Sequence, residues 1–190
     1  MPSLYEQRQE VSITDPSATL VSAGLSNNTF NFPFTPNITV LQSSAYSEYS
    51  LTHTNFQQRA FDMSSNAELT LVAPVIVRSD EEAESVIKGA QFFRAAMKMT
   101  FANDPNPGLP PPVLRLNAYN LYKNVPVLIR DFTWNLENNI DYVTTASGER
   151  LPKVSNFVLS LSTTYGTDKI RQEFSVRDFA SGRLRDKGYI

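Results

Sequence analysis

The sequence predicts a mainly β protein: a β-sandwich or open barrel of two packed antiparallel sheets with one flanking α-helix. Short runs of alternating apolar and polar residues fill most of the chain after residue 65, a single segment has helical spacing, and turn residues separate these segments. A chain of 190 residues can bury one sizeable core. We therefore expect one β domain at residues 61–190 and an extended N-terminal arm at residues 1–60.

The first sixty residues differ in composition from the rest. Ser, Thr, Asn and Gln are frequent, prolines interrupt the segment, and no apolar period persists. Phe30, Phe32 and Phe34 are nevertheless the kind of side chain that docks on a partner surface. The prediction is an arm that becomes ordered on neighbouring subunits, with these three phenylalanines as interface residues. An independent subdomain is the alternative.

The first regular strand is expected at residues 68–77, where apolar residues alternate from Leu69 to Val77. A helix follows. Ser79 and Glu82 match a capping box, and acidic residues in the first turn and basic residues near the end suit the helix dipole. Its apolar stripe consists of Ala83, Val86, Ile87, Ala90, Phe93 and Met97. We interpret this stripe as core that packs on a sheet.

The helix is expected to end in a proline-rich loop at residues 103–112. Its Pro110–Pro112 run favours a rigid connection, with a polyproline ligand as the alternative. Two hairpins are expected next, one from residues 113–119 and 125–136 and the other from 156–165 and 170–176. Residues 141–145 can add a short strand.

Composition excludes most catalytic chemistry. The chain has no cysteine and a single histidine, His53, and it contains no nucleophile elbow, phosphate-binding loop or calcium loop. Asp131 and Asp141 could in principle form a two-carboxylate hydrolase pair, although neither has a local signature. A net charge of −2 argues against tight nucleic acid binding. We expect no enzyme activity, no cofactor and no metal, and neither a secretory signal nor a membrane span.

Several segments, taken in order, carry a family resemblance. They are Pro110-Pro111-Pro112-Val113-Leu114, Asn124-Val125-Pro126-Val127-Leu128-Ile129, Asp131-Phe132-Thr133-Trp134, Ile140-Asp141-Tyr142-Val143, Leu151-Pro152 and Phe174-Ser175-Val176-Arg177-Asp178-Phe179. Together they resemble the C-terminal domain of tail tube initiator, or baseplate tail-tube junction, proteins of contractile-tailed bacteriophages. The resemblance extends over about residues 65–182, and the first sixty residues lie outside it.

The resemblance implies the tail tube fold, in which six subunits close a ring. It also implies a structural virion protein at the junction of baseplate and tail tube, assembled in the host cytoplasm. Its partners would be other copies of itself in a homohexamer, baseplate hub proteins and the tail tube protein, with DNA only as passing cargo and no membrane. The alternatives are the tail tube protein proper and a β-sandwich that binds carbohydrate or another ligand through Trp134.

A channel for DNA needs a polar wall that is not strongly basic, because a cationic wall would hold the passing phosphates. Two rows of polar residues are candidates for such a wall. They are Ser160, Ser162 and Thr164, and Arg171, Glu173 and Ser175. An ordinary solvated outer face is the alternative for both.

Overall fold

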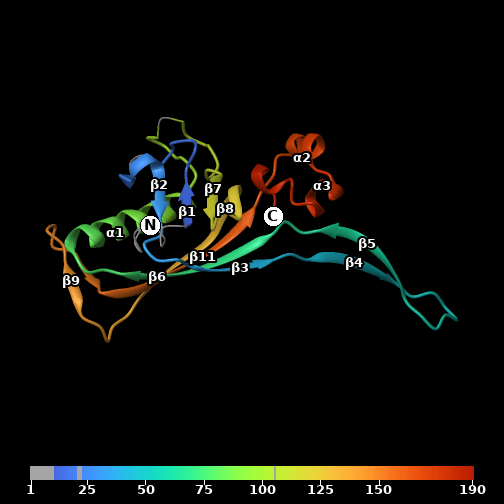
Figure 1. The fold of residues 1–190 in the computed structure, drawn as a ribbon, viewed down its shortest axis with the longest axis horizontal. Helices are drawn as coiled ribbons and strands as arrows, with labels where there is room; N and C mark the ends of the chain where they lie inside the picture. Colours follow the sequence, from blue (N-terminus) through green and yellow to red (C-terminus); the bar gives the residue numbers. More distant parts are fainter. Residues whose placement is uncertain (1–10, 21–22, 105) are drawn as a thin grey trace.

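The computed structural model describes residues 11–20, 23–104 and 106–190 of the chain (Figure 1). The strands are β1 (Val11–Thr14), β2 (Thr29–Asn31), β3 (Asn37–Leu41), β4 (Ser44–Tyr49), β5 (Gln58–Ser64), β6 (Glu68–Ile76), β7 (Leu114–Ala118), β8 (Tyr122–Leu136), β9 (Tyr142–Thr144), β10 (Arg150–Pro152) and β11 (Val154–Thr163). The helices are α1 (Asp80–Ala95), α2 (Thr167–Glu173) and α3 (Val176–Ala180), with 3₁₀ turns η3 (Ser26–Asn28) and η4 (Arg185–Lys187).

One large antiparallel sheet organises the molecule. Its strand order is β2-β1-β7-β8-β11-β6-β3, and β9 with β10 and β4 with β5 form separate two-stranded sheets. The mainly β class with a flanking helix is therefore confirmed.

The large sheet curls over its own core. Strands β2 and β11 are four positions apart in the sheet, which would separate them by about 19 Å if the sheet were flat. The rings of Phe30 in β2 and Phe157 in β11 nevertheless have centroids only 6.1 Å apart. Phe93 of α1 lies against both, with ring centroids at 5.0 and 6.0 Å. The sheet is thus curved into an open barrel, and the apolar face of α1 covers the core on its open side.

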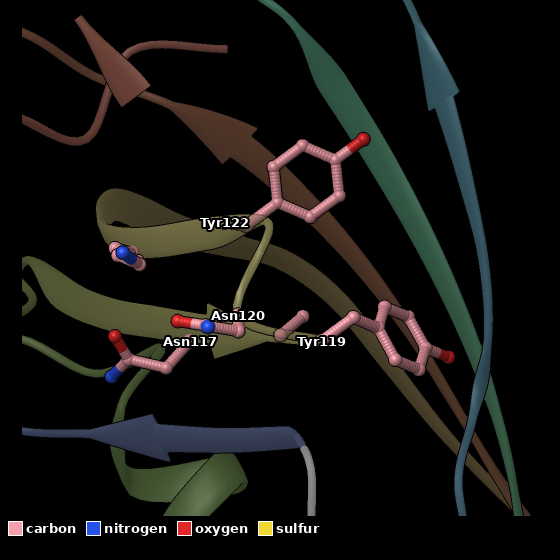
Figure 2. A pocket seen from close by; sticks show the side chains of 6 residues that line it. Asn117, Tyr119, Asn120 and Tyr122 are labelled. Atoms are coloured by element: carbon pink, nitrogen blue, oxygen red, sulfur yellow. The ribbon is translucent and has the colours of Figure 1, made fainter. Parts of the chain in front are cut away.

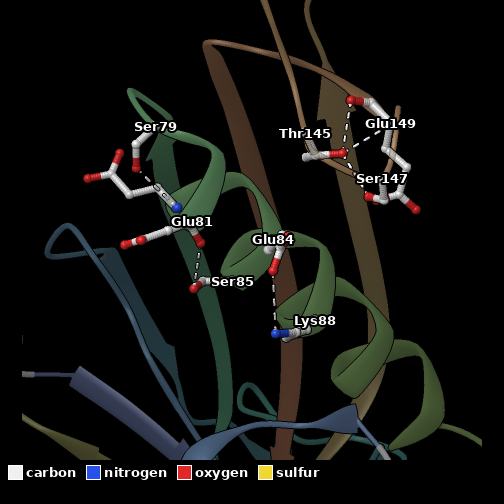
Figure 3. Close-up of polar contacts among 9 residues, drawn as sticks. Ser79, Glu81, Glu84, Ser85, Lys88, Thr145, Ser147 and Glu149 are labelled. Carbon is white, nitrogen blue, oxygen red and sulfur yellow. Dashed lines mark hydrogen bonds and ion pairs between the residues drawn. The ribbon is translucent and has the colours of Figure 1, made fainter.

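The strand at 68–77 and the helix after it are confirmed as β6 and α1. Every second residue of β6 from Leu69 to Val75 is buried. Ser79 caps α1 by accepting a hydrogen bond from the backbone N–H of Glu82 at 3.3 Å, and the Glu82 carboxylate accepts one from the Arg78 N–H at 2.8 Å. Figure 3 shows this helix start, together with the ion pair between Glu84 and Lys88 on the next turn.

The hairpin of residues 113–119 and 125–136 and the strands at 141–145 and 156–165 are also confirmed, as β7 with β8, β9 and β11. Strand β8 begins earlier than expected, at Tyr122. A tight turn allows this, because Tyr119 and Asn120 both adopt positive φ angles of 53°.

The strand expected at residues 170–176 is wrong. This segment forms α2 and the start of α3 instead (Figure 1). The physical reason lies in the sheet, where β11 already has β8 on one side and β6 on the other, so it cannot accept a third strand. Ile170 and Phe174 are also four residues apart, a spacing that suits one face of a helix. The row Arg171, Glu173 and Ser175 is therefore not the face of a strand.

The structure does not divide at residue 60. Strand β1 lies inside the large sheet between β2 and β7, and β3 pairs with β6, so residues 11–20 and 23–41 belong to the β domain. Strands of three to five residues are too short for alternation to mark them in a sequence. The part that projects from the domain is the β4–β5 hairpin (Figure 1). Residues 1–10 of the expected arm lie outside the described residues.

Candidate assembly surfaces

The residues considered for catalysis lie apart on the surface. Asp131 is exposed on β8, opposite Ser160 of β11. Asp141 is exposed in the loop before β9, where its carboxylate pairs with Lys153 at 3.1 Å. His53 is exposed in the loop that joins β4 to β5. No hydrogen bond or ion pair connects these three residues.

Within the described ranges, no group of three or more histidine, aspartate or glutamate side chains is placed to hold a metal ion. The helices of that same part of the chain are all too short or too polar to cross a membrane.

A small pocket lies beside the β7–β8 turn, and residues that line it hold the turn in place (Figure 2). The Tyr119 hydroxyl donates a hydrogen bond to the carbonyl of Pro36 at 2.6 Å, and Asn117 Oδ1 accepts one from the Asn124 N–H at 2.8 Å. These bonds stabilise the turn, in which Tyr119 and Asn120 adopt positive φ angles that residues other than glycine rarely adopt. The pocket therefore has a structural explanation.

Trp134 is half-buried and packs toward the core. Its indole N–H donates to Ser155 Oγ at 3.1 Å, and its ring meets Phe157 edge to face with centroids 5.5 Å apart. A sugar-stacking platform needs a ring face open to solvent. The contacts of Trp134 favour a role in the core.

The three phenylalanines named from the sequence have different environments. Phe30 and Phe32 are 4% and 0% exposed and pack edge to face with centroids 5.1 Å apart. They belong to the core of this chain, and their expected role as interface residues stays a prediction. Phe34 is half-buried and lines a groove beside the first turns of α1. Its role at an interface stays a prediction.

The outer face of strands β3, β6, β11 and β8 has a polar central row. The strand register aligns Thr39, Thr70, Ser160 and Asp131 in one row across the four strands. Beside this row, Glu68 of β6 forms an ion pair with Arg130 of β8. Ser160 and Ser162, proposed from the sequence for a channel wall, lie on this face, and Thr164 follows the end of β11. The central row is thus polar with mixed charge, whereas Leu41, Val72 and Val158 on the same face are apolar. The residues that β3 and β6 add to this face were not predicted from the sequence.

This four-strand block has an open edge on each side. Among the residues that the structure describes, β6 is the single strand that pairs with β3. On the other side, β7 pairs with β8 over residues 122–127, and no strand among the described residues pairs with residues 129–136 of β8 on the side away from β11. Unpaired edges are ready templates for strands of another chain.

The β4–β5 hairpin forms a second candidate surface. All seven residues of β5 are exposed, and five of the six in β4 are exposed. Tyr46, Phe61 and Met63 are 57%, 58% and 60% exposed. The exposure of these side chains could not be predicted from the sequence. Polar and apolar residues alternate with the same period in an exposed hairpin and in a half-buried one.

The C-terminal lobe, residues 165–190, provides a third candidate surface. Tyr165 and Tyr189 stack with ring centroids 4.7 Å apart, and the Ile190 N–H donates to the Tyr165 hydroxyl at 3.4 Å. Burial raises the pKa of Tyr165 above its ordinary value of 10.0. Exposed apolar side chains of Ile170, Phe174 and Phe179 line a groove between this lobe and the base of the β4–β5 hairpin.

Comparison with known proteins identifies no family. No protein-family model matches the chain. The serine/threonine-protein kinase TEL1 of Candida albicans is 40% identical over 75 residues, which is 35% of this chain. The match spans about 2% of that kinase's length, so it shows no relationship to the whole enzyme.

Two solved structures resemble the chain at low sequence identity. One is the tail of an empty GTA particle with C6 symmetry, at 10% identity and a TM-score of 0.39, covering 83% of this chain and 92% of that chain. The other is the virion of the native gene transfer agent particle, at 11% identity and a TM-score of 0.34, covering 82% of this chain and 96% of that chain. Both similar structures are of gene transfer agent particles.

Proposed function

We propose that this chain is a structural protein of a contractile phage tail that closes into a homohexameric ring where the baseplate meets the tail tube. The observation that carries this proposal is the four-strand block β8-β11-β6-β3, which has a free edge on each side among the described residues and a polar central row on its outer face. The chain carries no catalytic role in this account.

The strand directions support closure of a ring. Each neighbouring pair in the block is antiparallel, so β3 and β8 at its two sides run in opposite directions. When β3 of one copy lies beside residues 129–136 of β8 in the next, the new pair is antiparallel as well. Repetition of this head-to-tail contact extends the four-strand block through every copy, and closing it into a ring leaves neither edge of the block free.

The composition of the outer face supports its placement on the channel wall. Hydroxyl side chains of Thr39, Thr70 and Ser160 dominate its central row, while Arg130 is neutralised by Glu68. Such a wall offers hydration without a basic field, so duplex DNA could slide along it.

The position at the baseplate is supported by the sequence resemblance of residues 110–179 to tail tube initiator proteins. In this role the ring would contact baseplate hub proteins on one side and start polymerisation of the tail tube protein on the other. The protein would be located in the virion and assembled in the host cytoplasm.

The proposal is tested by electron microscopy of source particles that carry an antibody or tag label on this chain. Label confined to the baseplate end of the tube is the expected result. Label along the whole tube would make the chain the tail tube protein proper. Particles without any label would contradict the structural role altogether.

A further inference from the structure

The core beneath the four-strand block is incompletely covered at the two open edges of the block. Two apolar rows cross its inner face from β3 to β8, namely Ile38, Leu71, Leu159 and Phe132, and Val40, Leu69, Leu161 and Ile129. The four leucines in the middle of the rows are 0–1% exposed, whereas the residues at both ends are only partly buried. Trp134, on the same face of β8, is half-buried as well. Each copy therefore has partly exposed apolar side chains along both edges.

Resting on the proposed ring, we propose that β3 of the next copy completes the core along β8, with its Ile38 beside Trp134 and its Val40 beside Phe132. A second copy suits this edge, because its β3 runs antiparallel to β8 and carries apolar side chains on the same face of the sheet. The contact removes apolar surface of both copies from water, which stabilises it.

A β-bulge in β8 restricts the register of this contact. Arg130 is the extra residue of the bulge, because Asp131 lies opposite Ser160 and Ile129 lies opposite Leu161. Regular strand geometry on the open edge of β8 therefore extends over residues 131–136, which is enough for the five residues of β3.

One register keeps all of β3 opposite this regular segment and its apolar side chains on the inner face. A shift by one residue would move Ile38 and Val40 to the outer face. A shift by two residues would place β3 across the bulge or past the end of β8 at Leu136. The remaining register pairs Asn37 with Asn135, Ile38 with Trp134, Thr39 with Thr133, Val40 with Phe132, and Leu41 with Asp131.

The side chains that this register places opposite each other are chemically matched. On the inner face, the β-branched Ile38 and Val40 meet the aromatic rings of Trp134 and Phe132, and on the outer face Thr39 meets Thr133. Aromatic side chains beside β-branched ones, and threonine beside threonine, are favourable cross-strand pairs in antiparallel sheets. Pair chemistry thus supports the same register as the position of the bulge.

Disulfide formation in double-cysteine variants tests the register, because the chain has no cysteine of its own. Within one copy, residues 39 and 133 are three strand spacings apart, or about 14 Å, which is too far for a disulfide. In the proposed contact they lie directly opposite each other in adjacent copies, with Cα atoms about 4.5–5.5 Å apart. Oxidised assemblies of the Thr39→Cys/Thr133→Cys variant should therefore give a ladder of linked chains on a non-reducing gel.

Two matched controls combine Thr39→Cys with Asp131→Cys or with Asn135→Cys. Both controls keep the cysteines on the outer face but shift one of them by two residues along β8. Their Cα atoms would be about 7–8 Å apart across the contact, which disfavours a disulfide. We expect several-fold more linked chain in the Thr133→Cys variant than in either control.

Circular dichroism verifies the fold of each variant, and mass photometry of the same samples reports rings. Rings in which a control variant links as strongly as the Thr133→Cys variant would overturn the register and leave ring formation intact. Rings without linked chains in all three variants would overturn the contact between β3 and β8 and assign ring closure to another surface. A wild-type chain that forms no rings, either alone or mixed with baseplates from source particles, would overturn the proposed ring together with this contact.

Discussion

Gly89 shows how closely α1 approaches the core at the scale of one residue. A Cβ atom at this position would lie 2.1 Å from Cε2 of Phe30 and 2.6 Å from its Cδ2. Phe30 cannot withdraw easily, because Phe32, Phe93 and Phe157 surround its ring. The absence of a side chain at Gly89 is what allows β2 and α1 to pack together.

The variant Gly89→Ala should therefore lower the free energy of unfolding by about 1–2 kcal/mol, since overpacking outweighs the gain in helix propensity. Gly166→Ala is the matched control, because nothing lies within 4 Å of that site and its φ of −63° suits alanine. It should change stability by less than about 0.5 kcal/mol. Urea unfolding measures both, and equal stability of the two variants would contradict the proposed packing.

Tyr165 predicts a dependence of stability on alkaline pH. Burial raises its pKa above 10.0 in the folded chain, so the folded state holds the phenolic proton more tightly than the unfolded state. Its contribution is fully present below about pH 10 and is lost as the pH rises through the raised pKa. We expect the wild-type chain to lose more unfolding free energy between pH 8 and pH 11 than Tyr165→Phe does. Identical losses in urea titrations would exclude this role.

At the scale of elements, the length of an alternating segment decides whether its strand could be predicted from the sequence. Strands β6 and β11, nine and ten residues long, alternate for long enough to be recognised, and the Ser79 cap marks the start of α1. Strands β1 and β2 carry no such pattern, so Phe30 and Phe32 could be read as contacts of an arm. The segment after Gly166 alternates too, but β11 is already paired on both sides and cannot accept it as a strand. The spacing of Ile170 and Phe174 suits a helix instead.

The candidate surfaces were less predictable than the strands, for a related reason. The hydroxyl row of β11 was identified from alternation, but its alignment with Thr39 and Thr70 depends on strand order. Strand order is set by contacts between residues distant in sequence. No local pattern contains that information.

Two deletions separate the body of the domain from its projection. Replacement of residues 44–64 by Asn-Gly should keep the unfolding free energy within about 1 kcal/mol, because the two residues can close a tight hairpin turn between Ser43 and Ser65. Deletion of residues 11–41 should prevent folding, since it removes β1 from inside the sheet and Phe32 from the core. Thermal unfolding followed by circular dichroism measures both. A folded second variant would restore the view of this segment as an arm.

At the scale of the whole molecule, the polar face can be tested by adding charge. Thr70 is exposed in the middle of the four-strand block. In an assembled ring, Thr70→Arg would place one cation per copy on the channel wall, and tubes or rings should then retain linear duplex DNA at low salt and release it at high salt. The wild-type chain and Thr70→Gln should retain none.

Closed circular DNA distinguishes the two sides of the wall, because it cannot thread through a channel. Co-sedimentation should detect linear but not circular duplex with Thr70→Arg assemblies. Equal retention of both forms would place this face on the outside.

Strand β11 sits between β8 and β6 although it is the last strand of the chain. During synthesis, β6 and β8 are therefore made before the strand that lies between them. Until β11 is made, each has one edge without its native partner strand. The complete four-strand block can exist only after residue 163 has left the ribosome. If the block closes the proposed ring, a nascent chain has no complete block to offer a neighbour before that point, and self-association follows synthesis of β11.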